Sequence, residues 1–188
     1  MSEQIPEIEA KDAAAFRGWL ERNYEAATAV WLIFWKKGSG HPSIEWSDAV
    51  DQALCFGWID SKVQSIDENR YRQYFSVRKP GSVWSKINKE KIARLTAGGL
   101  MAPRGLASVE RAKQDGSWTI LDGPEAGSVP DDLAAALDEA GVRHVFEGLT
   151  SGGRKAILVW LAMAKRETTR ANRIEKTIAA LANGESPL

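Results

Sequence analysis

Eight cationic side chains stand close together in the middle of the sequence. Between Arg70 and Arg94 there are eight arginines and lysines and a single acid, Glu90, so this window has a formal charge of +7. The whole chain has 25 basic and 25 acidic residues, so the remainder carries −7. A positive window in a neutral chain favours an anionic partner, although it also fits the solvated face of a strand and a helix.

The spacing inside the window indicates which side chains would meet such a partner. If residues 70–78 form a strand, alternate side chains point to opposite faces. One face is then mostly apolar, and the other carries Arg70, Arg72, Tyr74, Ser76 and Arg78. A guanidinium group suits phosphate or carboxylate because its planar fork donates parallel hydrogen bonds. We therefore expect the arginine-bearing face to border a hollow walled by tryptophan and tyrosine rings.

The predicted ligand-binding residues lie on this strand and on both sides of it. They are Trp58, Asp60, Lys62, Arg70, Tyr71, Arg72, Arg78, Trp84, Lys86 and Asn88. Asn88 has two open explanations, because an asparagine inside a helix usually makes a hydrogen bond, either to a neighbouring loop or to a ligand. Neutralising Arg70, Arg72 and Arg78 together is expected to abolish binding and to leave the fold intact.

The sequence contains no recognisable catalytic set, so no catalytic residue is predicted. It has no paired carboxylates, triad or metal-ligand cluster, and its one cysteine, Cys55, excludes an internal disulfide. His41 and His144 lie far apart, and we expect neither a metal nor a cofactor. Gly-Ser-Gly at 38–40 lacks the ending of a phosphate-binding loop and indicates a turn. An enzyme that uses Asp60 with Lys62 or Arg70 stays an alternative.

Periodicity and helix breakers predict the elements that position these residues. Apolar spacing predicts a helix over 10–26, and the apolar run 30–36 predicts a central strand buried on both faces. A second helix can begin at Ser47, carry its apolar stripe to Trp58 and end in a turn at Asp60–Lys62. Residues 62–66 and 70–77 are expected to pair as an antiparallel hairpin. Helices are predicted to follow from Ser82 or Ser85 to about residue 97, and over 103–114.

The character of the chain changes after residue 116. Residues 116–130 are rich in glycine, proline and serine, and beyond them only helical patterns occur, the last helix being capped by Thr168. We predict an α+β domain at 1–116 with a small antiparallel or mixed sheet packed with helices, a linker at 117–130 and an all-helical module at 131–188. No apolar run reaches the ~18 residues of a membrane span, and no signal peptide is recognisable, so we expect a cytoplasmic protein.

Several motifs carry a resemblance to a known family. They are VWLIFWKKGSGHPSI, ALCFGWIDS at 53–61, the RY…Q-F…R-K pattern at 70–79, WSKIN at 84–88, the glycine-rich 95–105 segment and GSW at 116. With them, nearly the whole chain resembles the YdeI/OmpD-associated family, which is named for bacteriocin protection. The C-terminal WLAMAKRETTRANRIEK is similar to the helical module that gives the family its name. The resemblance implies a bacterial stress-protection role, in tolerance to bacteriocins or antimicrobial peptides.

Three classes of function fit these observations. The preferred one is a non-enzymatic binding domain for a small anionic molecule or an acidic protein segment. The second is binding of single-stranded nucleic acid or a nucleotide, because basic residues interleaved with aromatic ones hold single strands by stacking and phosphate contact. A neutral chain fits a dedicated nucleic-acid binder less well. The third is the enzyme alternative. Direct capture of a cationic peptide fits the positive window least, and no oligomeric state is predicted.

Overall fold

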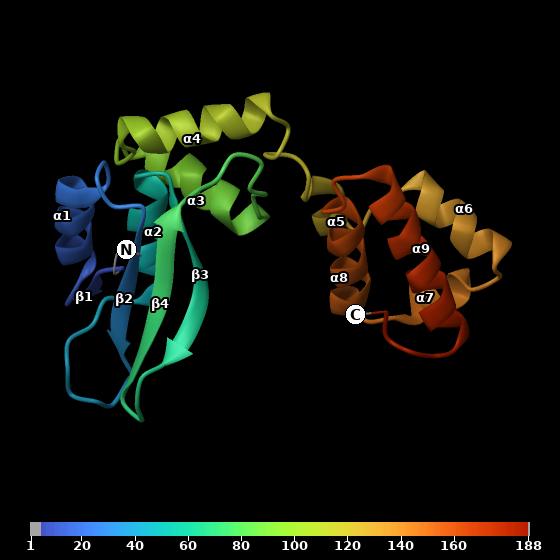
Figure 1. Cartoon of the computed structure of the whole chain (residues 1–188), viewed down its shortest axis with the longest axis horizontal. Helices are drawn as coiled ribbons and strands as arrows, with labels where there is room; N and C mark the ends of the chain where they lie inside the picture. Colours follow the sequence, from blue (N-terminus) through green and yellow to red (C-terminus); the bar gives the residue numbers. More distant parts are fainter. Residues whose placement is uncertain (1–4, 188) are drawn as a thin grey trace. The chain divides into compact units, whose positions relative to one another are not determined.

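A four-stranded mixed sheet is the centre of the N-terminal part of the chain. The computed structural model describes residues 5–187 (Figure 1). The strands are β1 (Glu7–Glu9), β2 (Ala29–Trp35), β3 (Trp58–Ser65) and β4 (Arg70–Val77), in the order β1-β2-β4-β3. β1 runs parallel to β2, and the other neighbours are antiparallel. The predicted α+β class, the central position of β2 and the β3–β4 hairpin are therefore confirmed.

Two helices pack on one face of this sheet. They are α1 (Ala13–Asn23) and α2 (Trp46–Cys55). The ring of Phe16 meets that of Phe75 edge-on, with centroids 5.4 Å apart. The side chains that β2 and β4 direct to this face are mostly buried, whereas Trp31, Ile33 and Trp35 on the other face of β2 are half-buried. The prediction that β2 is buried on both faces is therefore wrong.

The second helix is shorter than its apolar pattern predicts. It ends at Cys55, and Gly57 adopts a left-handed conformation with φ of +72° that reverses the chain. Trp58 then begins β3 instead of closing a helical stripe, and Asp60 and Lys62 lie in that strand instead of a turn. Trp58, the first residue of β3, is as buried as the last residues of α2. A short apolar run cannot distinguish a buried helix from a buried strand.

Two further helices, α3 (Lys86–Ala97) and α4 (Pro103–Gln114), follow the sheet. α4 begins very close to the end of α2, because the backbone N–H of Ala102 donates to the carbonyl of Cys55 at 2.9 Å. A Cβ atom on Gly105 would lie only 2.1 Å from that carbonyl oxygen. Glycine is thus required at the first turn of α4 for the two helices to come together.

The chain forms two compact units that divide unevenly along the sequence. Unit 1 extends to Ser82 and resumes over Ile87–Asp115, and unit 2 consists of Val83–Lys86 and the chain from Gly116 onward. In unit 2 the helices are α5 (Asp122–Ala126), α6 (Asp131–Glu139), α7 (Arg143–Gly148), α8 (Ser151–Ala162) and α9 (Glu167–Ala182). The segment predicted to be a linker, 117–130, therefore contains α5 and groups with the helices that follow it.

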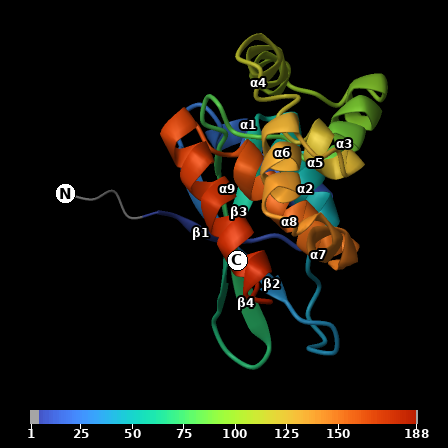
Figure 2. The ribbon, with the colours of Figure 1, turned by 90° about the vertical axis from the view of Figure 1, so that its right-hand side faces the viewer.

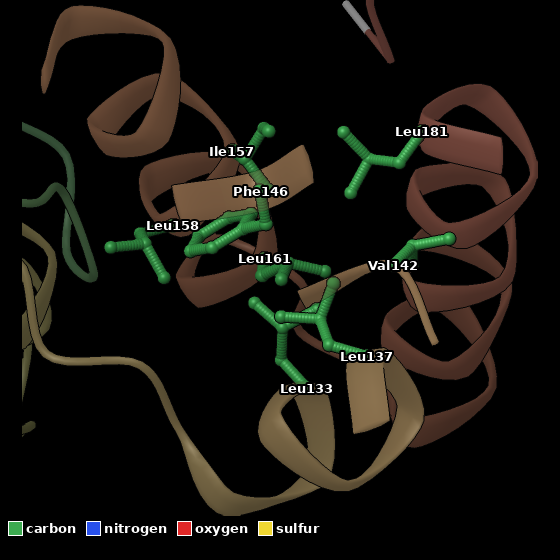
Figure 3. Packing of buried hydrophobic residues seen from close by; sticks show 8 residues of the cluster. All are labelled: Leu133, Leu137, Val142, Phe146, Ile157, Leu158, Leu161 and Leu181. Atoms are coloured by element: carbon green, nitrogen blue, oxygen red, sulfur yellow. The ribbon is translucent and has the colours of Figure 1, made fainter. Parts of the chain in front are cut away.

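The helices of unit 2 enclose a core of their own. α8 packs against α5 and α9, and α6 and α7 also pack against α9 (Figure 2). One cluster of buried side chains is aliphatic apart from one phenylalanine (Figure 3): Leu133, Leu137, Val142, Phe146, Ile157, Leu158, Leu161 and Leu181. α9 begins at Glu167 with Arg166 as its N-cap, so the prediction that Thr168 caps it is wrong. Across residues 5–187, no helix has the length and apolar character needed to cross a membrane.

Candidate binding face of the sheet

Aromatic and arginine side chains gather on the side of the sheet opposite α1 and α2. The five that define this sheet face are Trp31 and Trp35 from β2 and Arg70, Arg72 and Tyr74 from β4. The register places Trp31 beside Tyr74 and Trp35 beside Arg70. All five side chains are half-buried. Strand alternation therefore brings two guanidinium groups and three rings to one surface.

Arg72 lies over an indole ring and has partners within the chain. Its guanidinium carbon is 4.5 Å from the ring centroid of Trp31. Nε and Nη2 donate to Oε1 of Gln64 at 3.0 and 2.7 Å, and Nη1 contacts the carboxylate of Glu7. The carboxylate comes from β1 and the amide from β3, so Arg72 spans the sheet between its two edge strands.

Arg70 has the same arrangement two residues earlier in β4, on the same face of the strand. Its guanidinium carbon is 5.1 Å from the ring centroid of Trp35, and Nε donates to Oδ2 of Asp67 at 2.9 Å. This hydrogen bond is the main reason that the pKa of Asp67 is lowered; burial acts in the opposite direction, and the backbone N–H groups of Asn69 and Arg70 reinforce the lowering. Among the residues that the structure describes, Nη1 of Arg70 meets no acceptor.

The rings of the sheet face are also fixed by neighbours. Trp31 and Tyr74 meet edge-to-face with centroids 5.0 Å apart. His41 stacks on Trp35 at 4.0 Å, and the indole N–H of Trp35 donates to Glu9 at 3.3 Å. Beside Trp31 there is an open hollow of about 570 Å³, lined by Ile5, Pro6, Glu7 and Trp31. A ligand at this face would therefore meet oriented rings rather than mobile ones.

Eight of the ten predicted site residues are not among the five that define this face, and Trp58, Tyr71 and Arg78 are buried or point to the opposite side of the sheet. Trp58 is 0% exposed, contacts Trp19 edge-on at 6.1 Å, and is a core residue. Tyr71 lies on the opposite face and stacks on Phe34 at 5.0 Å, and burial raises its pKa. Arg78 is only 4% exposed, and burial lowers its pKa to about 10 while the nearby Asp60 carboxylate opposes the shift. The expectation that Arg78 is displayed is wrong, because β4 ends at Val77 and strand alternation stops there.

Asp60 and Lys62 lie on β3, but the structure does not bring Asp60 together with Arg70. Oδ2 of Asp60 accepts hydrogen bonds from Trp46 Nε1 and Gln73 Nε2, both at 3.1 Å. Asp60 faces residue 75 of β4, five positions from Arg70, a separation of roughly 16 Å along a strand. Lys62 is exposed at the bulge between Asp60 and Val63. The alternative of an enzyme that uses Asp60 together with Arg70 therefore has no site in which the two side chains meet.

The remaining predicted residues belong to other parts of the structure. Trp84 and Lys86 group with unit 2, and Asn88 is a half-buried residue of α3. Two other cations of the positive window, Lys91 and Arg94, both contact the buried carboxylate of Asp51. The window is thus divided among separate surfaces, and only Arg70 and Arg72 of its cations lie on the sheet face.

Sequence reasoning missed Trp31, Trp35 and Glu7 as members or neighbours of this face. β2 is apolar at every position, so it gives no alternation that would identify an outer side. β1 has only three residues, and two of them are glutamates. Within residues 5–187, no group of three or more His, Cys, Asp or Glu side chains could hold a metal ion.

The fold and the sheet face define a protein with an α+β part that displays arginines over indole rings and a separate helical part. The chain belongs to the family described as Domain of unknown function (DUF8412), whose model matches residues 8–108. Residues 127–184 match the family described as Bacteriocin-protection, YdeI or OmpD-Associated, which confirms that resemblance for the helical part. No curated protein and no solved structure matches the chain.

Proposed function

We propose that this bacteriocin-protection-type protein is a non-enzymatic binding protein that holds a small anionic molecule or an acidic protein segment on its sheet face. The observation that supports this most is the pair of guanidinium groups, Arg70 and Arg72, held over Trp35 and Trp31. Indole rings orient a guanidinium group by cation–π attraction and leave its edge available for an anion. Nη1 of Arg70 carries N–H groups that can donate hydrogen bonds to such an anion.

The existing ion pairs do not prevent this binding. Side chains of the Arg70–Asp67 and Arg72–Glu7 pairs are between 29% and 45% exposed. Exposed pairs of this kind contribute only about 0–1 kcal/mol. A carboxylate or phosphate that gains two charge-assisted hydrogen bonds, each worth about 1.5–3 kcal/mol, can therefore displace Asp67 or Glu7.

A thermal-shift screen tests the proposal, because a ligand that prefers the folded state raises its stability. The probes are small carboxylates, phosphate compounds and a glutamate-rich peptide, at low salt. A probe that raises the melting temperature of the native protein is expected to lose most of this effect with Arg70→Gln/Arg72→Gln. Lys79→Gln is the control, since it removes an exposed cation just beyond β4. An equal shift in the native protein and both variants contradicts the proposal.

Single-stranded nucleic acid or a nucleotide is the second candidate, and the three rings on the same face as the arginines favour it. Base–aromatic stacking contributes about 1–3 kcal/mol per base. In this case Trp31→Leu should weaken oligonucleotide binding about tenfold or more, as measured by fluorescence anisotropy. Trp46→Leu is the matched control, because Trp46 is 48% exposed and lies outside the sheet face. Equal binding by both variants would exclude stacking on Trp31.

We place this binding in the cytoplasm and in bacterial tolerance to bacteriocins, as part of the same proposal. The match of residues 127–184 to the bacteriocin-protection family supports the role in bacteriocin tolerance. Deletion of the gene should lower survival under bacteriocin challenge, and Arg70→Gln/Arg72→Gln should fail to restore it while Lys79→Gln restores it. Cell fractionation tests the compartment.

A further inference from the structure

The short segment Val83–Lys86 belongs to unit 2, although the chain on both sides of it belongs to unit 1. The backbone therefore passes from one unit to the other after Ser82, after Lys86 and again after Asp115. The segment begins after the loop that follows β4 and ends at the first residue of α3, and it includes the Trp-Ser-Lys motif of the sequence. Its tryptophan was predicted to line a ligand pocket, and the sheet face does not include it.

A ring contact and a backbone hydrogen bond join this segment to the helical unit. Trp84 is 1% exposed, and its ring is 5.0 Å from that of Trp118, at an interplanar angle of 48°. The backbone N–H of Lys86 donates to Oε2 of Glu125 in α5 at 2.7 Å. The Glu125 side chain is only 11% exposed, and its other oxygen lies 3.5 Å from Nζ of Lys155 in α8. This mostly covered carboxylate thus accepts from the segment and from α8 at once.

We propose that Val83–Lys86 is a strap, inserted from the N-terminal part of the chain, whose tryptophan completes the packing of unit 2 around Trp118. Neither tryptophan lies within the region that matches the bacteriocin-protection family, 127–184. Burial of a tryptophan stabilises the fold because it removes a large apolar area from water, and a hydrogen bond to a charged carboxylate adds further stability. The seated strap therefore adds to the stability that the aliphatic core gives the helical unit. This inference does not depend on the proposed ligand.

Because the strap packs within unit 2, we expect its release to loosen unit 2 before unit 1 unfolds. The sheet of unit 1 has its own core of buried β2 and β4 side chains, packed on α1 and α2. Release of the strap removes Trp84 from unit 2, whereas the buried side chains of β2 and β4 belong to unit 1. Loss of strap contacts should thus loosen α5 and α8 while β2 and β4 keep their protection.

Hydrogen–deuterium exchange of the full-length Trp84→Ala variant tests the strap. Amides of α5 and α8 are expected to exchange about a hundredfold faster or more than in the native chain, as for a truncated core tryptophan. Amides of β2 and β4 should change less than about twofold, because the buried side chains of these strands pack within unit 1. Unchanged protection of α5 and α8 overturns the proposal. Equal loss in β2 and β4 also overturns it, because Trp84 would then support the whole chain.

A milder pair of variants keeps the proposal testable where Trp84→Ala does not yield folded protein. Glu125→Ala removes the acceptor of the Lys86 N–H, and Lys155→Ala removes the other partner of Glu125 and leaves the strap bond in place. Exchange in α5 should become about tenfold faster with Glu125→Ala and change little with Lys155→Ala. The same effect from both variants would show that the strap bond does not matter.

Discussion

At the scale of single residues, Asp60 has a structural role, and a substitution can measure its contribution to the free energy of unfolding. Its carboxylate accepts from Trp46 and Gln73, and its charge favours the protonated form of the buried Arg78. Asp60→Asn should therefore lower the free energy of unfolding by about 1–3 kcal/mol, because donors near a half-buried carboxylate lose their charged acceptor. Urea unfolding of the purified variant gives this value.

Asp48→Asn is the matched control for that measurement. Asp48 is an exposed residue in the first turn of α2, and its loss should cost less than about 1 kcal/mol. A variant of Asp60 with unchanged stability and lost turnover of some substrate would instead support the enzyme alternative.

A second residue-scale prediction concerns the acid sensitivity of unit 2. The guanidinium group of Arg170 in α9 donates to both oxygens of Asp132 in α6, at 2.6 and 2.8 Å. This side-chain hydrogen bonding is the largest cause that lowers the pKa of Asp132, and burial opposes it. A pKa lower in the folded state than in the unfolded chain means that the pair stabilises unit 2 above the unfolded pKa. This stability is lost as the pH falls through the folded pKa.

Urea midpoints of the native protein and Asp132→Asn should therefore differ most near neutral pH and converge in acid. The series runs from pH 7 to about pH 2.5, well below the ordinary aspartate value. Asp131→Asn, an exposed neighbour in the same first turn of α6, is the control and should not show this convergence. A gap between native protein and Asp132→Asn that stays constant with pH would contradict the assignment.

At the scale of elements, the contact between α2 and α4 depends on a glycine. A Cβ atom at Gly105 would lie 2.1 Å from the Cys55 carbonyl oxygen, a backbone atom that cannot rotate away. Gly105→Ala should force the helices apart and cost about 1–3 kcal/mol, despite the better helix propensity of alanine. Thermal and urea unfolding measure the loss.

Gly18→Ala in α1 is the matched control for this element-scale prediction. Its new Cβ would meet only the far end of Arg22, at 3.4 Å, so the change should stabilise the protein by up to about 1 kcal/mol. A loss at Gly18 equal to that at Gly105 would mean that helix packing is not the cause.

The elements show which features a sequence can predict. The face alternation of β4 was predictable because polar and apolar residues alternate along it, and α4 was predictable because Pro103 begins it and Asp115-Gly116 ends it. The end of α2 was not predictable, because buried residues continue from the helix into β3 with only Phe56 and the left-handed Gly57 between them. The sheet face was half predictable: Arg70 and Arg72 came from alternation, whereas the indoles beneath them lie in a uniformly apolar strand.

At the scale of the whole molecule, the positive window does not form one positive surface. Of its cations, Arg78 is buried, Lys91 and Arg94 share Asp51, and Arg70 and Arg72 face Asp67 and Glu7. Sequence charge counts residues along the chain, while binding depends on which cations share a face. The formal net charge of zero adds no general attraction for nucleic acid.

This charge distribution makes the salt dependence of oligonucleotide binding a sharp test of the second candidate function. If Arg70 and Arg72 each neutralise one phosphate, log K should fall with log salt at a slope of about −1.4, or roughly sevenfold between about 50 and 200 mM. Arg70→Gln/Arg72→Gln should flatten this slope, and Lys79→Gln should leave it unchanged. A slope steeper than about −4 would require cations beyond the sheet face. A flat response in the native protein would exclude phosphate contacts altogether and leave a small carboxylate or an acidic protein segment as the ligand of the two arginines.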